Sequence, residues 1–208
     1  PDIPIYMSQG AKKVLWNLET TSSTPFNEFL LFKYLGGHAL HTKQDRFTFI
    51  SGDSVAMPRD IRVFNEATSE KKGESFNVGH VKVESYGVDH SVPGSCGFII
   101  HTSSGPVVFT GDLRLRGRKG KETKYFIQKA KEAKPKYMLC EGTGLSKTDS
   151  GTEEDIVKNL TQIVKKTTGL VVVDYAGRNM DRIVSMAEVA KKTGRIQVID
   201  SRQANLLE

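Results

Sequence analysis

The stretch Val88–Asp112 constrains the fold of this chain more than any other, and it reads VDHSVPGSCGFIIHTSSGPVVFTGD. Two apolar segments, Cys96–His101 and Pro106–Thr110, flank a Ser-Ser-Gly turn, which predicts a hairpin of two strands. His90 precedes the first strand and Asp112 follows the second. Because the open ends of a hairpin lie side by side, we expect this imidazole and this carboxylate to meet. Imidazole nitrogen and carboxylate oxygen are ligands that zinc takes in hydrolytic sites.

The composition sets broad limits on the class of protein. The chain has 208 residues and a net charge of +6, which permits a polyanionic partner without establishing one. No apolar run approaches the roughly 18 residues of a membrane span, and the first residues lack a signal-peptide pattern. The two cysteines, Cys96 and Cys140, suggest no disulfide framework, and both are expected to be buried thiols. A cytoplasmic protein with no membrane partner is therefore expected.

The first half of the chain reads mostly as strands. Alternation of apolar and polar residues predicts strands over Arg46–Ser51, Asp60–Phe64 and Val78–Tyr86, with a polar loop over Ala67–Gly73. One helix is predicted among them, with Thr24 as its cap and the glycine pair at 36–37 as its end. This half therefore favours an α+β arrangement.

The second half alternates helices with strands. The expected helices cover Glu122–Ala133, the segment that begins at the cap Thr152, and Asn179–Lys192, and the expected strands cover Tyr137–Cys140, Leu170–Val173 and Ile196–Ile199. Alternation of this kind predicts parallel strands joined by helical crossovers, which is the α/β class. A domain boundary is expected near Ser146–Gly151.

The H-S-V-P-G-S and F-T-G-D motifs around His90 and Asp112 resemble those of metallo-β-lactamase-fold hydrolases. The resemblance is strongest to the RNA-processing branch that includes ribonuclease J and the mRNA 3′-end cleavage nuclease. The segment Leu139–Thr143 (LCEGT) resembles the acidic motif that opens the inserted β-CASP domain of that branch. The resemblance implies that residues 1–146 are the later part of an αββα sandwich. It also implies that residues 147–208 begin a parallel-sheet α/β β-CASP domain.

The same resemblance assigns roles to individual residues. It implies that His90 ligates a metal ion and that Asp112 bridges two zinc ions, which would hold the hydroxide that attacks the phosphate. Glu141, at the end of a predicted strand, would support the catalytic centre, for example by a hydrogen bond to a ligand histidine, although a turn carboxylate is the plain alternative. Asp89 is expected to be structural, because neighbouring strand residues point to opposite faces.

The family's first metal-binding motif, His-x-His-x-Asp-His, is not present in the sequence. The only close pair of histidines, His38 and His41, has a different spacing and follows a predicted helix end, so it is interpreted as loop structure. We therefore expect the chain to begin just after that motif and to end before the family's later histidine motifs. His90 and Asp112 cannot fill a dinuclear zinc site, so the isolated chain is expected to be inactive.

A basic loop follows Asp112 directly. Its cations Arg114, Arg116, Arg118 and Lys119 suit phosphate binding, with the arginines preferred, although charge runs are often only solvated. A second basic turn, with Arg178 and Asn179, opens a predicted helix and offers free backbone N–H groups to an anion; capping by Asn179 is the plain alternative. RNA is the partner that these features and the resemblance imply.

Two rival functions stay open at this point. One is hydrolysis of a small ester, thioester or lactone by the same fold, which the basic loop and the α/β continuation disfavour. The other is a non-catalytic module that binds RNA through its basic face. The sequence upstream of Pro1 would separate the enzyme from the binding module. A homodimer is compatible with the sequence, which does not test it.

Overall fold

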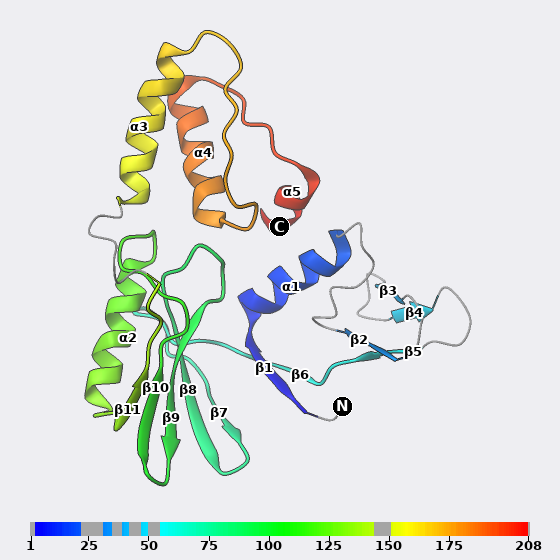
Figure 1. The fold of residues 1–208 in the computed structure, drawn as a ribbon, viewed down its shortest axis with the longest axis vertical. Helices are drawn as coiled ribbons and strands as arrows, with labels where there is room; N and C mark the ends of the chain where they lie inside the picture. Colours follow the sequence, from blue (N-terminus) through cyan, green and yellow to red (C-terminus); the bar gives the residue numbers. More distant parts are fainter. Residues whose placement is uncertain are drawn as a thin grey trace. The chain divides into compact units, whose positions relative to one another are not determined.

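The computed structural model describes residues 3–21, 31–34, 39–41, 47–49, 55–143 and 151–207. The chain divides into two compact units (Figure 1). One unit combines Pro1–Val63 with Asp200–Glu208, and the other is Phe64–Ile199. The expected domain boundary after residue 146 falls outside the described residues and stays a prediction.

The first unit begins with strand β1, Ile5–Ser8, which leads directly into helix α1, Gln9–Thr21. The side-chain oxygen of the buried Ser8 accepts the N–H of Ala11 at 3.1 Å, so it caps the first turn of this helix. The remaining elements are β2 Leu31–Tyr34, β3 Ala39–His41, β4 Phe47–Phe49, β5 Val55–Pro58, β6 Ile61–Phe64 and α5 Ser201–Leu207. The strands of this unit form three two-stranded sheets, in which β1 pairs with β6, β2 with β5 and β3 with β4.

The helix predicted to begin at Thr24 is wrong where it can be checked. Residues Leu31–Tyr34 form a strand that pairs antiparallel with Val55–Pro58. Four residues are too few to distinguish a helical from a strand period, so pairing decided the outcome. The rest of the predicted helix and His38 lie outside the described residues, and the helix α1 was not predicted.

The second unit contains a five-stranded sheet in the order β11-β10-β9-β8-β7 (Figure 1). Its strands are β7 Ser75–Val78, β8 Val81–Gly87, β9 Cys96–Thr102, β10 Gly105–Phe109 and β11 Tyr137–Leu139. The predicted hairpin is confirmed as β9 and β10, in which Gly105 lies opposite Thr102. The strand predicted over 78–86 is confirmed as β8 from Val81 onward, but it begins three residues later than predicted, because Gly79 has a φ of 59° and turns the chain between β7 and β8.

Helix α2, Gly120–Glu132, packs on this sheet and connects β10 to the parallel strand β11. The buried ring of Phe126 lies in the core with Tyr86, Ile99 and Val108. A Cβ atom at Gly97 would lie 2.4 Å from that ring, so the glycine lets the helix approach the strand closely. The predicted amphipathic helix at this place is confirmed.

Two further helices, α3 Glu153–Lys166 and α4 Met180–Thr193, pack around Val157, Val164 and Val189. Thr152 and Asp155 form a reciprocal capping box at the start of α3. Both helices were predicted from their caps and their apolar spacing, and both are confirmed.

The strands predicted after these helices are not formed. Residues 170–173 and 196–199 are described but adopt no strand, and Leu170 is 88% exposed and Ile196 91% exposed. An extended segment becomes a strand only when a neighbour accepts its hydrogen bonds, and no described segment does so here. The α/β class is confirmed for the chain, but not by a parallel sheet in this part.

Cys96 is half-buried and Cys140 is exposed, so burial was wrongly predicted for Cys140. It follows β11, an edge strand whose three residues are all exposed. In the part of the chain that the structure describes, no helix is long and apolar enough to cross a membrane.

Candidate functional site

Three strands bring the predicted catalytic residues to one edge of the sheet. Strands β8 and β10 both run antiparallel to β9, and β11 runs parallel to β10. Their carboxyl ends therefore lie at the same edge. His90 follows β8, Asp112 follows β10 and Glu141 follows β11. The topology thus places the three residues that the sequence singled out at one end of the sheet.

The turn that carries Asp112 depends on its glycine. Gly111 has a φ of 58°, and a Cβ atom there would lie 2.7 Å from the carbonyl oxygen of Cys96. Both the backbone conformation and the lack of space exclude a side chain. Gly111 therefore fixes the path by which Asp112 leaves the strand, and Asp112 itself is exposed.

Glu141 holds the backbone immediately after Asp112. Its Oε1 accepts the N–H of Leu113 at 2.7 Å, and its own N–H donates to Oγ1 of the buried Thr110 at 3.4 Å. Within the described residues this carboxylate bonds a backbone amide rather than a histidine. Glu141 therefore acts as a turn carboxylate, which was the alternative to support of a ligand histidine. The backbone amide that it holds belongs to Leu113, the residue directly after Asp112.

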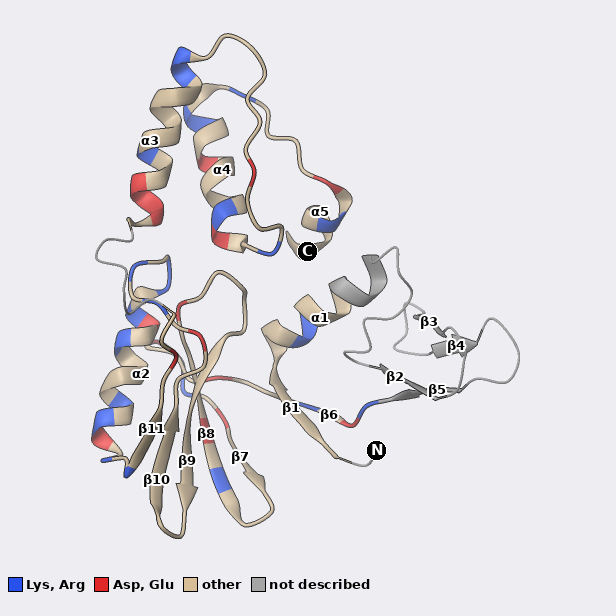
Figure 2. Cartoon of the chain, in the orientation of Figure 1, with Lys and Arg blue, Asp and Glu red and all other residues tan. Residues whose placement is uncertain are grey.

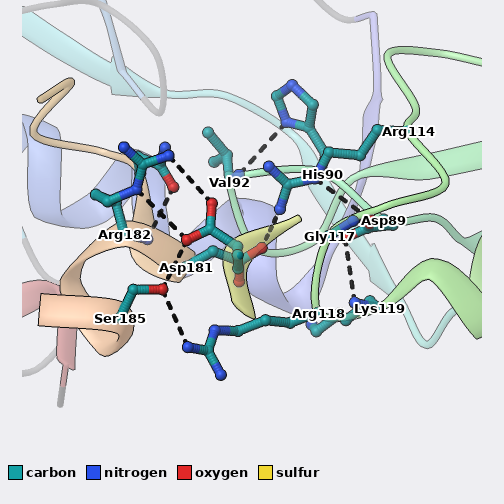
Figure 3. Close-up of polar contacts among 12 residues, drawn as sticks. Asp89, His90, Val92, Arg114, Gly117, Arg118, Lys119, Asp181, Arg182 and Ser185 are labelled. Carbon is teal, nitrogen blue, oxygen red and sulfur yellow. Dashed lines mark hydrogen bonds and ion pairs between the residues drawn. The ribbon is translucent and has the colours of Figure 1, made fainter. Parts of the chain in front are cut away.

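His90 is half-buried, and its Nδ1 accepts the N–H of Val92 at 3.4 Å (Figure 3). This contact leaves Nε2 as the ring nitrogen that can bind a metal ion. Among the described residues, no three His, Cys, Asp or Glu side chains gather into a metal-binding group. Among the described residues, His90 and Asp112 would therefore supply two of the three or four ligands that a zinc site needs.

Asp89, directly before His90, is fully buried and structural, as the sequence predicted. Its carboxylate accepts the backbone N–H groups of Gly117 at 2.6 Å and Lys119 at 3.2 Å (Figure 3). Its own N–H donates to the hydroxyl of the buried Thr123, on α2, at 2.8 Å. Asp89 thus ties the His90 loop, the basic loop and helix α2 together.

The side chain of Arg114 forms ion pairs with two carboxylates. Its Nε lies 3.4 Å from Oδ2 of Asp89, and its Nη2 bonds Asp181, in the first turn of α4 (Figure 3). Burial raises the pKa of Asp181 above its ordinary value. The cation of Arg114 lowers this pKa and the negative charge of Asp89 raises it, and the net effect is a raised pKa. Arg114 was a leading candidate for RNA contact, and the structure gives its guanidinium an internal role.

Arg118 is also engaged inside the unit. Its Nη2 donates to the hydroxyl of Ser185 at 3.0 Å and lies 2.8 Å from a carboxylate oxygen of Glu188. The hydroxyl of Ser185 in turn donates to Glu153 at 2.6 Å. These partners were missed from the sequence because they lie on α3 and α4, far along the chain from the basic loop.

Glu153 is a buried carboxylate at the start of α3. Its Oε1 lies 3.2 Å from Nη2 of Arg182. Burial by itself raises the pKa of Glu153, but the hydrogen bonds from Ser185 and Arg182 outweigh it, so the pKa is lowered. The charged form of Glu153 is therefore stabilised by the fold.

The remaining predicted RNA-binding residues are at the surface. Arg116, Lys119 and Arg178 are exposed. The side chain of Asn179 accepts the N–H of Arg182 at 3.0 Å and caps α4, which confirms its capping role. Binding of RNA by these four residues stays a prediction.

Helix α4 also contacts the His90 loop, because the N–H of Met180 donates to the carbonyl of Ser91 at 3.0 Å.

Comparison with known proteins gives relatives of one kind. No protein-family model matches the chain. Ribonuclease J from Sinorhizobium meliloti is 31% identical over 159 residues, which are 71% of this chain and 28% of that protein. Ribonuclease J from Mycoplasma pneumoniae is 26% identical over 173 residues, or 78% of this chain and 30% of that protein. The chain thus spans less than a third of the length of these curated relatives.

A solved structure supports the fold. The crystal structure of a protein of unknown function from Enterococcus faecalis V583 matches with a TM-score of 0.69 and 22% sequence identity. The match covers 100% of this chain and 43% of that one. At this identity the likeness concerns the fold alone.

Proposed function

Because this chain belongs to the ribonuclease J-like family of metallo-β-lactamase/β-CASP proteins, we propose that it is part of an enzyme that cleaves RNA phosphodiester bonds. The observation that carries the proposal is the common edge of β8, β10 and β11, from which His90, Asp112 and Glu141 follow. Carboxylates and an imidazole grouped at strand ends are typical of hydrolytic metal sites.

In the proposed enzyme, His90 and Asp112 are two ligands of a zinc centre whose other ligands come from outside the described residues. Bound zinc supplies a Lewis acid for the phosphate and acidifies water. The chain's own contribution is to orient the two ligands. Gly111 and Glu141 fix the turn of Asp112, and Asp89 fixes the backbone beside His90.

The non-catalytic RNA-binding module remains the second candidate. It is supported by the exposed cations Arg116, Lys119 and Arg178, whose binding to phosphates would need no metal ion. It differs from the enzyme in chemistry but not in its RNA partner, so a binding assay alone does not separate the two.

A parallel assay of the intact protein tests the proposal. Labelled single-stranded RNA, a nitrophenyl ester and a simple lactone are each incubated with the protein, with and without a chelator. The proposal predicts that RNA is cut and that the chelator stops the cutting, while the ester and the lactone persist. Hydrolysis of the ester or lactone alone would identify a small-molecule hydrolase. RNA binding without any hydrolysis would identify the binding module.

A further inference from the structure

The positive charge of the chain is concentrated in one segment. Residues 114–136 carry ten basic and two acidic residues, a net charge of +8, whereas the whole chain carries +6. The rest of the chain is therefore slightly acidic. This segment comprises the loop after Asp112, helix α2 and the turn that leads into β11.

Four of these ten cations are paired with acidic or hydroxyl groups of the same unit. Arg114 and Arg118 are paired with acidic or hydroxyl groups of α4. At the surface of α2, Lys121 pairs with Glu70 of a preceding loop, and Lys129 pairs with Glu132 of the same helix.

Three of the other cations lie on α2 or directly after it, namely Lys124, Lys131 and Lys134, and they are here called the lysine stripe. All three are exposed, and none has an acidic partner among the described residues. The surplus charge of α2 therefore faces solvent without compensation.

Two members of the stripe lie on one face of α2, and Lys134 follows the end of the helix. Lys124 and Lys131 are seven residues apart, which is about two helical turns, so they lie on the same face with about 10 Å between them along the axis. Phe126 points from another face into the core. Figure 2 shows blue segments, which mark Lys and Arg, along the length of this helix. A row of cations at this spacing suits an extended chain of phosphates.

Lys134 adds a separate observation. Its φ is 49°, and it is the only described residue other than glycine with a positive φ. Glycine or asparagine is usual at such a position after a helix, because other side chains are strained there.

The stripe begins near the candidate site and leads away from it. Thr123, in the first turn of α2, contacts Asp89 beside His90. At the other end, the N–H of Lys136 donates to the carbonyl of Pro106, where β10 begins. The helix therefore runs from the edge that carries His90 and Asp112 to the opposite edge of the sheet, a length of about 20 Å.

From these observations we propose that the lysine stripe is a second RNA contact, which binds the phosphates of single-stranded RNA outside the cleavage site. The proposal rests on the proposed function for the identity of the polyanion. It assigns phosphate binding to the lysines of α2, whereas the sequence favoured the arginines of the preceding loop. Single-stranded RNA is the occupant that fits, because it is flexible and carries one charge per nucleotide.

The test compares long and short RNA in the intact protein. The triple variant Lys124→Gln, Lys131→Gln, Lys134→Gln is measured beside a control with the same loss of charge on α3 and α4, Lys158→Gln, Lys165→Gln, Lys191→Gln. Affinity is measured at several salt concentrations for unrelated single-stranded RNAs of about 6 and about 30 nucleotides. A third variant with arginine at the three stripe positions keeps the charge.

The proposal predicts that the glutamine variant binds the long RNAs roughly tenfold more weakly and the short RNAs as before. The slope of log affinity against log salt should become shallower by about 0.7 for each lost contact. The arginine variant and the control should bind like the wild type. Unchanged affinity and slope for long RNA would overturn the proposal, as would an equal loss for short and long RNA. Cleavage of the short RNA, measured in the same samples, reports on the proposed function independently.

Discussion

The carboxylate of Asp89 accepts the backbone N–H of Gly117 at 2.6 Å, across 28 residues of sequence. Gly117 has no room for a side chain, because a Cβ atom there would lie 2.4 Å from that same carboxylate. The residue before the candidate ligand His90 and the loop after the candidate ligand Asp112 are thus joined by a buried, charge-assisted contact. Such contacts are roughly twice as strong as neutral ones.

Asp89→Asn should destabilise the protein by about 2–4 kcal/mol, because it removes a buried negative charge beside Arg114 and turns one acceptor into a donor. The measurement is the free energy of unfolding in denaturant. Asp60→Asn is the control, since Asp60 pairs with Arg62 at the surface and its loss should matter little. If the two changes lowered the free energy of unfolding equally, the buried contacts of Asp89 would contribute no more to stability than a surface ion pair.

Gly111→Ala should reduce both stability and RNA cleavage, because the new methyl group meets the carbonyl of Cys96 and displaces the Asp112 turn. Gly79→Ala is the matched control, with nearly the same φ of 59° but nothing within 4 Å of the new atom. The control should show backbone strain alone, about 1–2 kcal/mol, and normal cleavage. If Gly111→Ala behaved like its control, the lack of space between Gly111 and the carbonyl of Cys96 would not matter for RNA cleavage.

The two substitutions of Glu141 should differ. Glu141→Gln keeps an oxygen that can accept the N–H of Leu113, whereas Glu141→Ala leaves that amide without its partner. We expect Ala to lower RNA cleavage roughly tenfold and Gln to retain most of it, by analogy with the support that surrounding groups give metal ligands. Single-turnover cleavage rates provide the comparison. Loss of activity in both variants would show that the charge, not the hydrogen bond, is needed.

Glu153 should make the protein less stable in acid. Its pKa is lowered in the folded state, so its contribution is present above the unfolded pKa near 4.5 and is lost as the pH falls through the folded value. Glu153→Gln should therefore be less stable than wild type at pH 7, and the difference should shrink as the pH falls below about 4.5. Unfolding curves at pH 7, 5 and 3.5 measure this. A difference that is constant with pH would mean that the charge of Glu153 contributes nothing.

Local signals made much of this fold predictable. The Ser-Ser-Gly turn identified the β9–β10 hairpin, and the caps Thr152 and Asn179 identified α3 and α4. These features depend on residues within a few positions of one another. The strand at 31–34 was not predictable in the same way, because a four-residue segment takes its conformation from its partner.

The candidate site likewise has a part that could be predicted from local sequence and a part that could not. Its position was predictable, because strand direction places His90, Asp112 and Glu141 at one edge. The role of Arg114 was not, because its partner Asp181 lies 67 residues away and no local pattern connects the two. A run of basic residues looks the same in sequence whether it faces RNA or a buried carboxylate.

The most direct test of the proposed function is RNA cleavage by the intact protein with Asp112→Asn. Asn is nearly the same size but lacks the charge that a metal-bridging ligand needs, so the fold should be kept and RNA still bound. Glu154→Gln, which removes an exposed carboxylate from α3, is the control. We predict that single-turnover cleavage falls by at least about 100-fold in Asp112→Asn and stays at the wild-type rate in the control. Cleavage at the wild-type rate by correctly folded Asp112→Asn would contradict the account.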